Sequence, residues 1–268
     1  MFIVKVPGIN SRENSTNGCE KSGNALIESL KGIHGNEQSR IIDAALLDLE
    51  EIHLDNSRLE MANNLIYKNA GEIFDEKPKT IFLGGDHSIS YPLVKAFFEF
   101  CGKNRKESCL IIFDSRPNCM KNKGKFPTND GWLRSIVESG FPAGNVMLVG
   151  ARNQNSEEIE FINKNRIKNI GVNPLLTNIE DTCDTIMEFS HGKELYLSID
   201  MGVVDPVFAP SATFQDCGGL SPMQLIYLIQ RISRVKGLAA VDIVEINPER
   251  EGSQQTIALG AKILSELI

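Results

Sequence analysis

Several short apolar runs of this sequence end in a residue that could bind a metal: His87, Asp114, Asp200 and Glu245. In an open sheet of parallel strands, ligands bind outside the carboxyl ends of the strands. One histidine and three carboxylates gathered there could hold a hard cation or perform acid–base chemistry. Arg116 stands two residues after Asp114, and Gly202 stands two residues after Asp200. A cation and a residue without a side chain therefore occupy places where further ligands would be expected.

The elements that must position these residues follow an alternating pattern. Short runs rich in β-branched residues alternate with longer amphipathic stretches, which is typical of a parallel sheet with crossover helices. Strands are expected at 2–6, 41–47, 80–84, 109–113, 145–149, 167–171, 194–199 and 238–246. Helices are expected at 23–31, 57–74, 89–102, 130–139, 155–164, 179–189, 221–235 and 254–267. The longest stretches without clear periodicity, 7–22, 115–130 and 201–219, each follow a strand, where α/β proteins build their sites.

Composition limits the classes of function. The chain has 268 residues, 41% of them hydrophobic and 24% charged, which suits one α/β domain over 1–268. Its net charge of −7 argues against a nucleic-acid partner. No apolar run is long enough for a membrane span, and the first residues do not follow the order of a signal peptide. Six cysteines without a CxxC pair indicate a reduced, cytoplasmic protein.

The order of five short motifs is the most specific signal in the sequence. GGDHS (84–88), FDxR (113–116), SIDxxxxDP (198–206), GGLS (218–221) and VEINP (244–248) occur in this order. In this order the chain resembles the ureohydrolase superfamily, which includes arginase, agmatinase, guanidino-acid hydrolases and formimidoylglutamase. The resemblance covers nearly the whole chain. It implies a three-layer α/β/α fold with an eight-stranded, mainly parallel sheet, and a homo-oligomer, either a trimer or a hexamer.

The resemblance also implies a cofactor of two Mn²⁺ ions bridged by a hydroxide. In the family, this hydroxide attacks a guanidinium or amidine carbon. Of the six ligands in the family pattern, three are matched here, by His87, Asp114 and Asp200. The family's DAHxD segment has its histidine replaced by Arg116 and its second aspartate by Asn118, a weaker ligand. The next aspartate of the SxDxDxxDP segment is replaced by Gly202.

Two further positions match residues to which the family assigns a role in catalysis or substrate binding. Glu245 matches the glutamate that pairs with the substrate guanidinium, although it could also be a strand-end carboxylate with no substrate. Asp130, before Gly131, replaces a histidine found after the DAHxD segment, although it could simply cap the next helix.

The replacements affect the two expected metal positions unequally. The second position loses both of its private ligands, which are the ones that it does not share with the first position. They are replaced by Arg116 and Gly202, and we expect this second position to be lost. The first keeps His87, two carboxylates and an amide oxygen, which could bind a single divalent ion. A guanidinium about 4 Å from that ion would be repelled by roughly 8 kcal/mol at an effective dielectric constant near 20. We therefore expect Arg116 to fork onto Asp114 and Asp200 in place of metal, or otherwise to swing outward and leave a mononuclear site.

Two functions follow from these alternatives. The first is a pseudoenzyme that has lost the Mn²⁺ pair and retains a binding or oligomeric role. Its cleft could still bind a small guanidino or amidino ligand. The second is a hydrolase that cleaves C–N bonds in amidines or guanidines with one metal ion. A nucleotide-binding α/β protein is disfavoured because GxGxxG and GxxxxGK[ST] are missing from the sequence.

Overall fold

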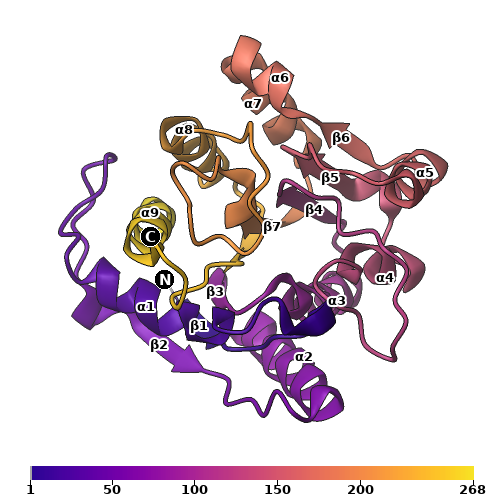
Figure 1. The fold of residues 1–268 in the computed structure, drawn as a ribbon, viewed down its shortest axis with the longest axis horizontal. Coiled ribbons are helices and arrows are strands. Elements are labelled where there is room, and N and C mark those ends of the chain that lie inside the picture. Colours follow the sequence, from indigo (N-terminus) through magenta and orange to yellow (C-terminus); the bar gives the residue numbers. More distant parts are fainter. Residues whose placement is uncertain (1) are drawn as a thin grey trace.

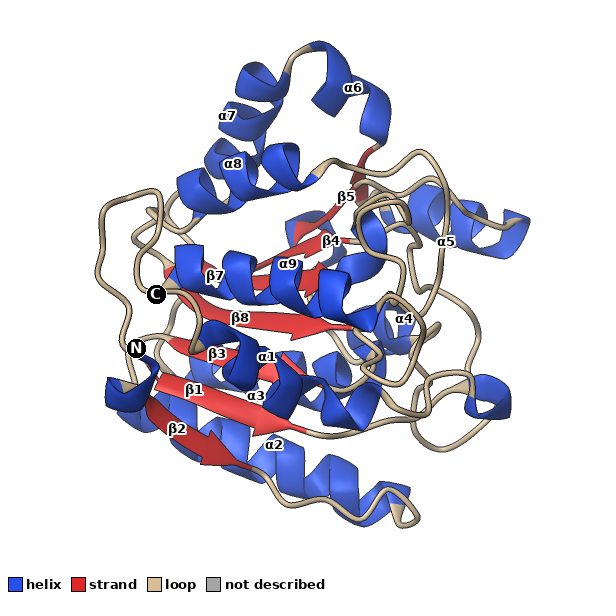
Figure 2. Ribbon diagram, turned by 60° about the vertical axis from the view of Figure 1, so that its left-hand side comes forward, coloured by secondary structure: helices blue, strands red, loops and turns tan. Residues whose placement is uncertain are grey.

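Eight strands form one sheet at the centre of the molecule, and every neighbouring pair is parallel (Figures 1 and 2). The computed structural model describes residues 2–268. The strands are β1 (Phe2–Val6), β2 (Asp48–Glu51), β3 (Thr80–Gly84), β4 (Ser108–Phe113), β5 (Val146–Val149), β6 (Lys168–Ile170), β7 (Glu194–Asp200) and β8 (Leu238–Val244). The α-helices are α1 (Ser22–Leu30), α2 (Leu59–Glu76), α3 (Ser90–Lys103), α4 (Trp132–Glu138), α5 (Ser156–Asn165), α6 (Val172–Thr177), α7 (Ile179–Phe189), α8 (Pro222–Ile232) and α9 (Ser253–Leu267).

Helices cover both faces of the sheet, which confirms the predicted three-layer α/β/α fold. Side chains of α1, α7, α8 and α9 pack on one face, and side chains of α2, α3, α4 and α5 pack on the other. The strands supply alternate residues to these two cores: Ile81 and Leu83 point to the first, and Phe82 points to the second. Strands buried on both faces explain the nearly continuous apolar runs in the sequence.

The strand order places side by side the four strands that precede the candidate site residues. The order is β2-β1-β3-β8-β7-β4-β5-β6, so β3, β8, β7 and β4 are consecutive neighbours. Because all strands are parallel, their carboxyl ends meet at one edge of the sheet. His87, Glu245, Asp200 and Asp114 therefore emerge next to one another in this same spatial order.

One expected strand is wrong and one predicted helix start is confirmed. Residues 41–47 form a loop with a short helical turn at Ala44–Leu46, and β2 begins at Asp48. The β2 strand pairs only with β1 at the sheet edge, where its sequence DLEE is mostly exposed and carries no apolar alternation. By contrast, Ser221 caps α8 as expected, and a reciprocal bond to Gln224 completes a capping box.

A partly buried arginine, Arg152, holds the loop that follows β7. The guanidinium of Arg152 donates to the carbonyl oxygens of Gly202 at 2.8 Å, Val203 at 3.1 Å and Asp216 at 2.5 Å. These bonds join the two ends of the 201–219 segment, one of the three stretches without sequence periodicity.

No helix within residues 2–268 has the length and apolar character needed to span a bilayer.

We predict that Arg152→Ala lowers the free energy of unfolding by about 3 kcal/mol, because it leaves several partly buried carbonyl groups without a donor. Urea denaturation followed by circular dichroism measures the change. Arg234→Ala, at an exposed position, is the matched control and should change stability by less than about 0.5 kcal/mol. Equal effects of the two substitutions would contradict the role assigned to Arg152.

Candidate metal and substrate site

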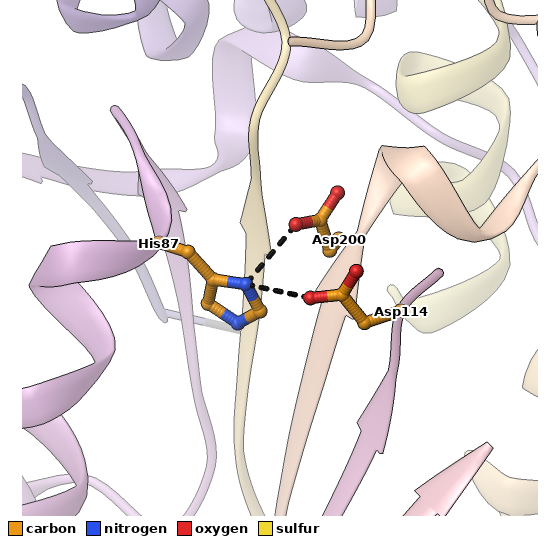
Figure 3. A group of neighbouring side chains, drawn as sticks. All are labelled: His87, Asp114 and Asp200. Carbon is orange, nitrogen blue, oxygen red and sulfur yellow. Dashed lines mark hydrogen bonds and ion pairs between the residues drawn. The ribbon is translucent and has the colours of Figure 1, made fainter. Parts of the chain in front are cut away.

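Three of the predicted ligands converge on one point (Figure 3). The Nδ1 atom of His87 lies 3.1 Å from Oδ2 of Asp114 and 3.1 Å from Oδ2 of Asp200. The amide nitrogen of Asn118 lies 3.1 Å from the same Nδ1 and 2.5 Å from Oδ2 of Asp114. The three residues that Figure 3 shows are only 1–4% exposed. Bulk water can therefore do little to balance the charges here.

The spacing of these atoms suits the coordination sphere of a small divalent ion. Ligands at about 2.1 Å from an ion in octahedral geometry lie roughly 3 Å from their neighbours. Asn118 has φ 54°, in the left-handed region that Asn and Asp tolerate better than most residues. A half-turn of its amide would present the oxygen as a fourth ligand. The donor set of one imidazole, two carboxylates and one amide therefore fits a single ion.

A relay behind His87 orients its ring. The Oγ atom of Ser198 lies 2.9 Å from Nε2 of His87 and donates to the buried Asp242 carboxylate at 2.7 Å. Asp242 also accepts hydrogen bonds from Ser90 and Tyr196. Because the Ser198 hydroxyl proton points to Asp242, its oxygen accepts the proton on Nε2. The other nitrogen, Nδ1, is then the atom that faces the aspartates and can bind a metal.

The two aspartates impose a strong need for positive charge. Burial and the neighbouring Asp114 carboxylate raise the pKa of Asp200 well above its usual range. Burial disfavours the charged form of His87, but hydrogen bonds to Asp114 and Asp200 outweigh it and hold its pKa well above the usual value. Without a metal ion, the His87 imidazolium is therefore the cation between the two acids.

The prediction that Arg116 forks onto the two aspartates is wrong, and its guanidinium has turned outward. Its Nε donates to Oδ2 of Asp216 at 2.8 Å, and its Nη2 lies 3.4 Å from Oδ1. The guanidinium carbon lies 4.1 Å from the ring centre of Phe214, in a cation–π contact. His87 supplies the charge instead, because its ring is fixed between the acids and Asp216 offers Arg116 a better-placed partner.

The second expected metal position has no side-chain ligand of its own. Backbone N–H groups satisfy the outer carboxylate oxygens: Arg116 N donates to Oδ1 of Asp114 at 2.9 Å, and Gly202 N donates to Oδ1 of Asp200 at 2.6 Å. A Cβ atom on Gly202 would lie 2.9 Å from that Asp200 oxygen, so the carboxylate would have to move to admit a side chain. In the described part of the chain, only His87, Asp114 and Asp200 form a group with metal-ligand spacing.

Glu245 lies beside this cluster, at the end of β8. Its Oε1 accepts from the His87 backbone N–H at 2.9 Å and from the Asn129 amide at 3.1 Å. Its Oε2 is buried and has no hydrogen-bond partner among residues 2–268. Burial, reinforced by the Asp86 carboxylate, raises the pKa of Glu245 to about 7. A buried carboxylate oxygen without a partner is a suitable acceptor for a ligand N–H.

The contacts of Asp130 do not support its predicted role in catalysis. Its carboxylate accepts from Thr128 at 2.5 Å and pairs with Arg12 at 2.9 Å. Asp130 does not cap α4 either. The N-cap residue of this helix is Gly131, and no side chain makes a capping hydrogen bond there. The neighbouring residue Asn129, and not Asp130, contacts Glu245. Asn129 could not be predicted from the sequence, because nothing in the motif indicates which of two adjacent loop residues points inward.

Trp132 gives the site a natural reporter. It is the only tryptophan in the sequence, it is fully buried, and its ring centre lies 4.8 Å from that of His87. Its indole nitrogen has no hydrogen-bond partner in the described residues. The intrinsic fluorescence of the protein should therefore respond to protonation of His87 or to its binding of a metal.

We predict that the metal-free protein becomes less stable as the pH rises from about 5 to 8. The pKa values of Asp86, His87, Asp200 and Glu245 are all raised, so the native state holds more protons than the unfolded chain in this interval. Glu245 alone contributes a fall of about 3 kcal/mol between its ordinary pKa of 4.5 and its raised pKa of about 7. Urea denaturation in EDTA at a series of pH values measures this slope.

Glu245→Gln should flatten the slope below about pH 7, because the variant has no proton to lose. Glu249→Gln, at an exposed surface ion pair with Lys21, is the matched control and should keep the slope. Stability that rises with pH over this interval would contradict the assignment.

The comparisons with known proteins agree with this geometry. Residues 2–268 match the family model described as "Arginase family". An agmatinase of Bacillus subtilis is 25% identical over 239 residues, which are 87% of this chain and 79% of that protein. An agmatinase of Neisseria meningitidis is 26% identical over 200 residues, 75% of this chain, and the match spans only 62% of that relative's length.

Solved structures show the same fold. The formimidoylglutamase of Bacillus subtilis superposes with a TM-score of 0.88 at 20% identity, covering 99% of this chain and 85% of that one. The agmatine ureohydrolase of Thermoplasma volcanium gives a TM-score of 0.82 at 20% identity, covering 99% and 87%. With its sheet order, its His–Asp–Asp cluster and a match over nearly its full length, the chain belongs to the arginase family, the ureohydrolases.

Proposed function

We propose that this protein hydrolyses a C–N bond in a linear amidine or guanidine with the help of one divalent metal ion. His87, Asp114, Asp200 and the Asn118 amide would hold the ion, and Glu245 would receive the amidinium group of the substrate. The single observation that carries the proposal is the convergence of the His87, Asp114 and Asp200 donor atoms at 3.1 Å, with the Arg116 guanidinium turned away to Asp216. Relatives named agmatinase and arginase support the reaction class.

Different residues of this chain would bind the metal ion and the substrate. When bound, a divalent ion lowers the pKa of water and polarises the bond under attack. The Ser198–Asp242 relay would keep Nδ1 of His87 aimed at the ion. The unpartnered Oε2 of Glu245 would accept an N–H of the substrate, and Asn129 would hold the carboxylate through its other oxygen.

A second candidate is a binding protein without turnover, the pseudoenzyme that the sequence first favoured. The observation in its favour is the replacement of both private ligands of the second metal position, by Arg116 and Gly202. Such a protein would still bind a small guanidino or amidino ligand at Glu245. For either function we propose a cytoplasmic homo-oligomer, a trimer or hexamer by analogy with the family, that acts on small molecules rather than on nucleic acid or membrane.

We predict one Mn²⁺ ion per chain after purification with added Mn²⁺, measured by elemental analysis and by a titration of Trp132 fluorescence. Asn118→Asp should tighten Mn²⁺ binding about tenfold or more, because a carboxylate replaces a neutral amide as ligand. Asn173→Asp, which adds the same charge at an exposed position of α6, is the control and should leave the affinity unchanged. No bound metal and no fluorescence change would rule out the metal-dependent function.

Turnover distinguishes the two candidates. We predict Mn²⁺-stimulated release of urea, ammonia or formamide from at least one of arginine, agmatine, guanidino acids and formimidoylglutamate. Metal binding without any such release would favour the binding protein.

The triple variant Arg116→His, Asn118→Asp, Gly202→Asp should bind two ions per chain, because it supplies the ligands of the second position and releases Asp216. The control is the same variant with Gly202 retained, which lacks one private ligand and should bind the second ion more weakly. A triple variant that folds but still binds one ion would show that the loop geometry, and not ligand identity, excludes the second ion.

A further inference from the structure

Arg116 is held rigidly at the solvent side of the site. Its side chain is 33% exposed, whereas the cluster below it is almost fully buried. Asp216 binds one edge of the guanidinium through Nε and Nη2, and Phe214 packs against its flat face. Asp216 is itself fixed by Ser115 at 3.0 Å and by Asn153 at 2.5 Å. The guanidinium is therefore pre-organised before any ligand arrives.

One edge of this guanidinium is unused. Within residues 2–268, Nη1 of Arg116 has no hydrogen-bond partner, and the bond from Nη2 to Asp216 is long at 3.4 Å. A guanidinium can bind a second carboxylate end-on through Nη1 and Nη2 while the first remains bound at the Nε edge. The arrangement leaves a fork of N–H donors available beside the cluster.

The charge of the site falls from a strongly acidic floor to a rim that is close to neutral. Among the described residues, the floor carries the buried acids Asp86, Asp114, Asp200 and Glu245 and one buried basic group, His87. At the rim, Arg116 and Asp216 neutralise each other, and Arg152 and Asp205 add one further charge of each sign. A cationic group is thus favoured at the floor, and the unused donor edge favours an anion at the rim.

We propose that Arg116 is a specificity-determining residue that selects amidine or guanidine ligands carrying a carboxylate at the opposite end of the molecule. This inference rests on the proposed function, in which Glu245 and the cluster receive the amidinium group. The carboxylate of the ligand binds end-on to Nη1 and Nη2 of Arg116, while Asp216 and Phe214 keep the guanidinium in place. A ligand with an ammonium tail would meet the guanidinium charge at the same position and is disfavoured.

The test compares three probes that share a guanidinium and a four-carbon chain and differ only at the tail. These are 4-guanidinobutanoate with a carboxylate, butylguanidine with a methyl group, and agmatine with an ammonium group. Isothermal titration calorimetry with the full-length protein, in the presence of Mn²⁺, gives the three affinities without requiring turnover. We expect the carboxylate probe to bind about tenfold more tightly than butylguanidine, and agmatine to bind most weakly.

Two variants should move the preference in opposite directions. Arg116→Gln removes the charge and should abolish the advantage of the carboxylate probe while leaving butylguanidine unchanged. Asp216→Asn keeps a hydrogen-bonding side chain but leaves the charge of Arg116 uncompensated, so it should increase the advantage of the carboxylate several-fold. Arg116→Lys keeps the charge without the fork and should retain only part of the preference.

Arg231→Gln is the matched control, because Arg231 also pairs with an aspartate, Asp184, and lies over an aromatic ring, that of Tyr227. It should leave all three affinities unchanged. A purely structural Arg116 would alter the three probes alike. The proposal is overturned if wild-type protein binds the probes equally or prefers agmatine, or if Arg116→Gln keeps the preference for the carboxylate.

The outcomes separate this proposal from the proposed function. Tail-dependent binding without any release of urea, ammonia or formamide would refute the hydrolase and leave the role of Arg116 intact. Turnover with equal affinities for the three tails would refute the role of Arg116 and leave the hydrolase intact.

Discussion

The burial of two aspartates against one histidine is the constraint on which the rest of the site depends. Asp114 and Asp200 both direct an oxygen at Nδ1 of His87 and are almost fully removed from water. Two adjacent buried carboxylates without a nearby cation would be strongly unfavourable. Because Ser198 and Asp242 hold the other ring nitrogen, the single lone pair at Nδ1 can take either a proton or a metal ion. Metal binding must therefore release a proton, and the two states of the site compete for one position.

The fold meets this constraint through strand order more than through any loop. The four acidic or imidazole groups come from β3, β8, β7 and β4, which are consecutive in the sheet although they are far apart in the sequence. The loops then add what the strands cannot. Arg152 ties the ends of the 201–219 segment together, and this segment carries Asp216 and Phe214 to the rim. The floor and the rim of the site are thus built by different parts of the chain.

The sequence predicted the floor well and the rim poorly, for physical reasons. Apolar runs that end in His87, Asp114, Asp200 and Glu245 identify both the strands and their ends, so a parallel sheet could be inferred from the pattern, and the family resemblance supplied the layers. The direction of Arg116 could not, because its partner Asp216 lies 100 residues later in a segment without periodicity. The choice between Asn129 and Asp130 depends on one residue of loop geometry. The edge strand β2 was missed because an exposed strand needs no apolar alternation, whereas the apolar residues just before it lie in a loop.

The carboxylate oxygens of the two aspartates all have hydrogen-bond partners among the described residues. In a two-ion site, both oxygens of each aspartate face positive charge. Here the inner oxygens face His87, and the outer oxygens accept N–H groups from the residues two positions later, Arg116 and Gly202. The backbone thus supplies donors at the same two positions where the family pattern has metal-binding side chains and this chain has Arg116 and Gly202. A single charge at Nδ1, from a proton or from one ion, is then enough to stabilise the pair, and the Arg116 side chain is released to serve the rim.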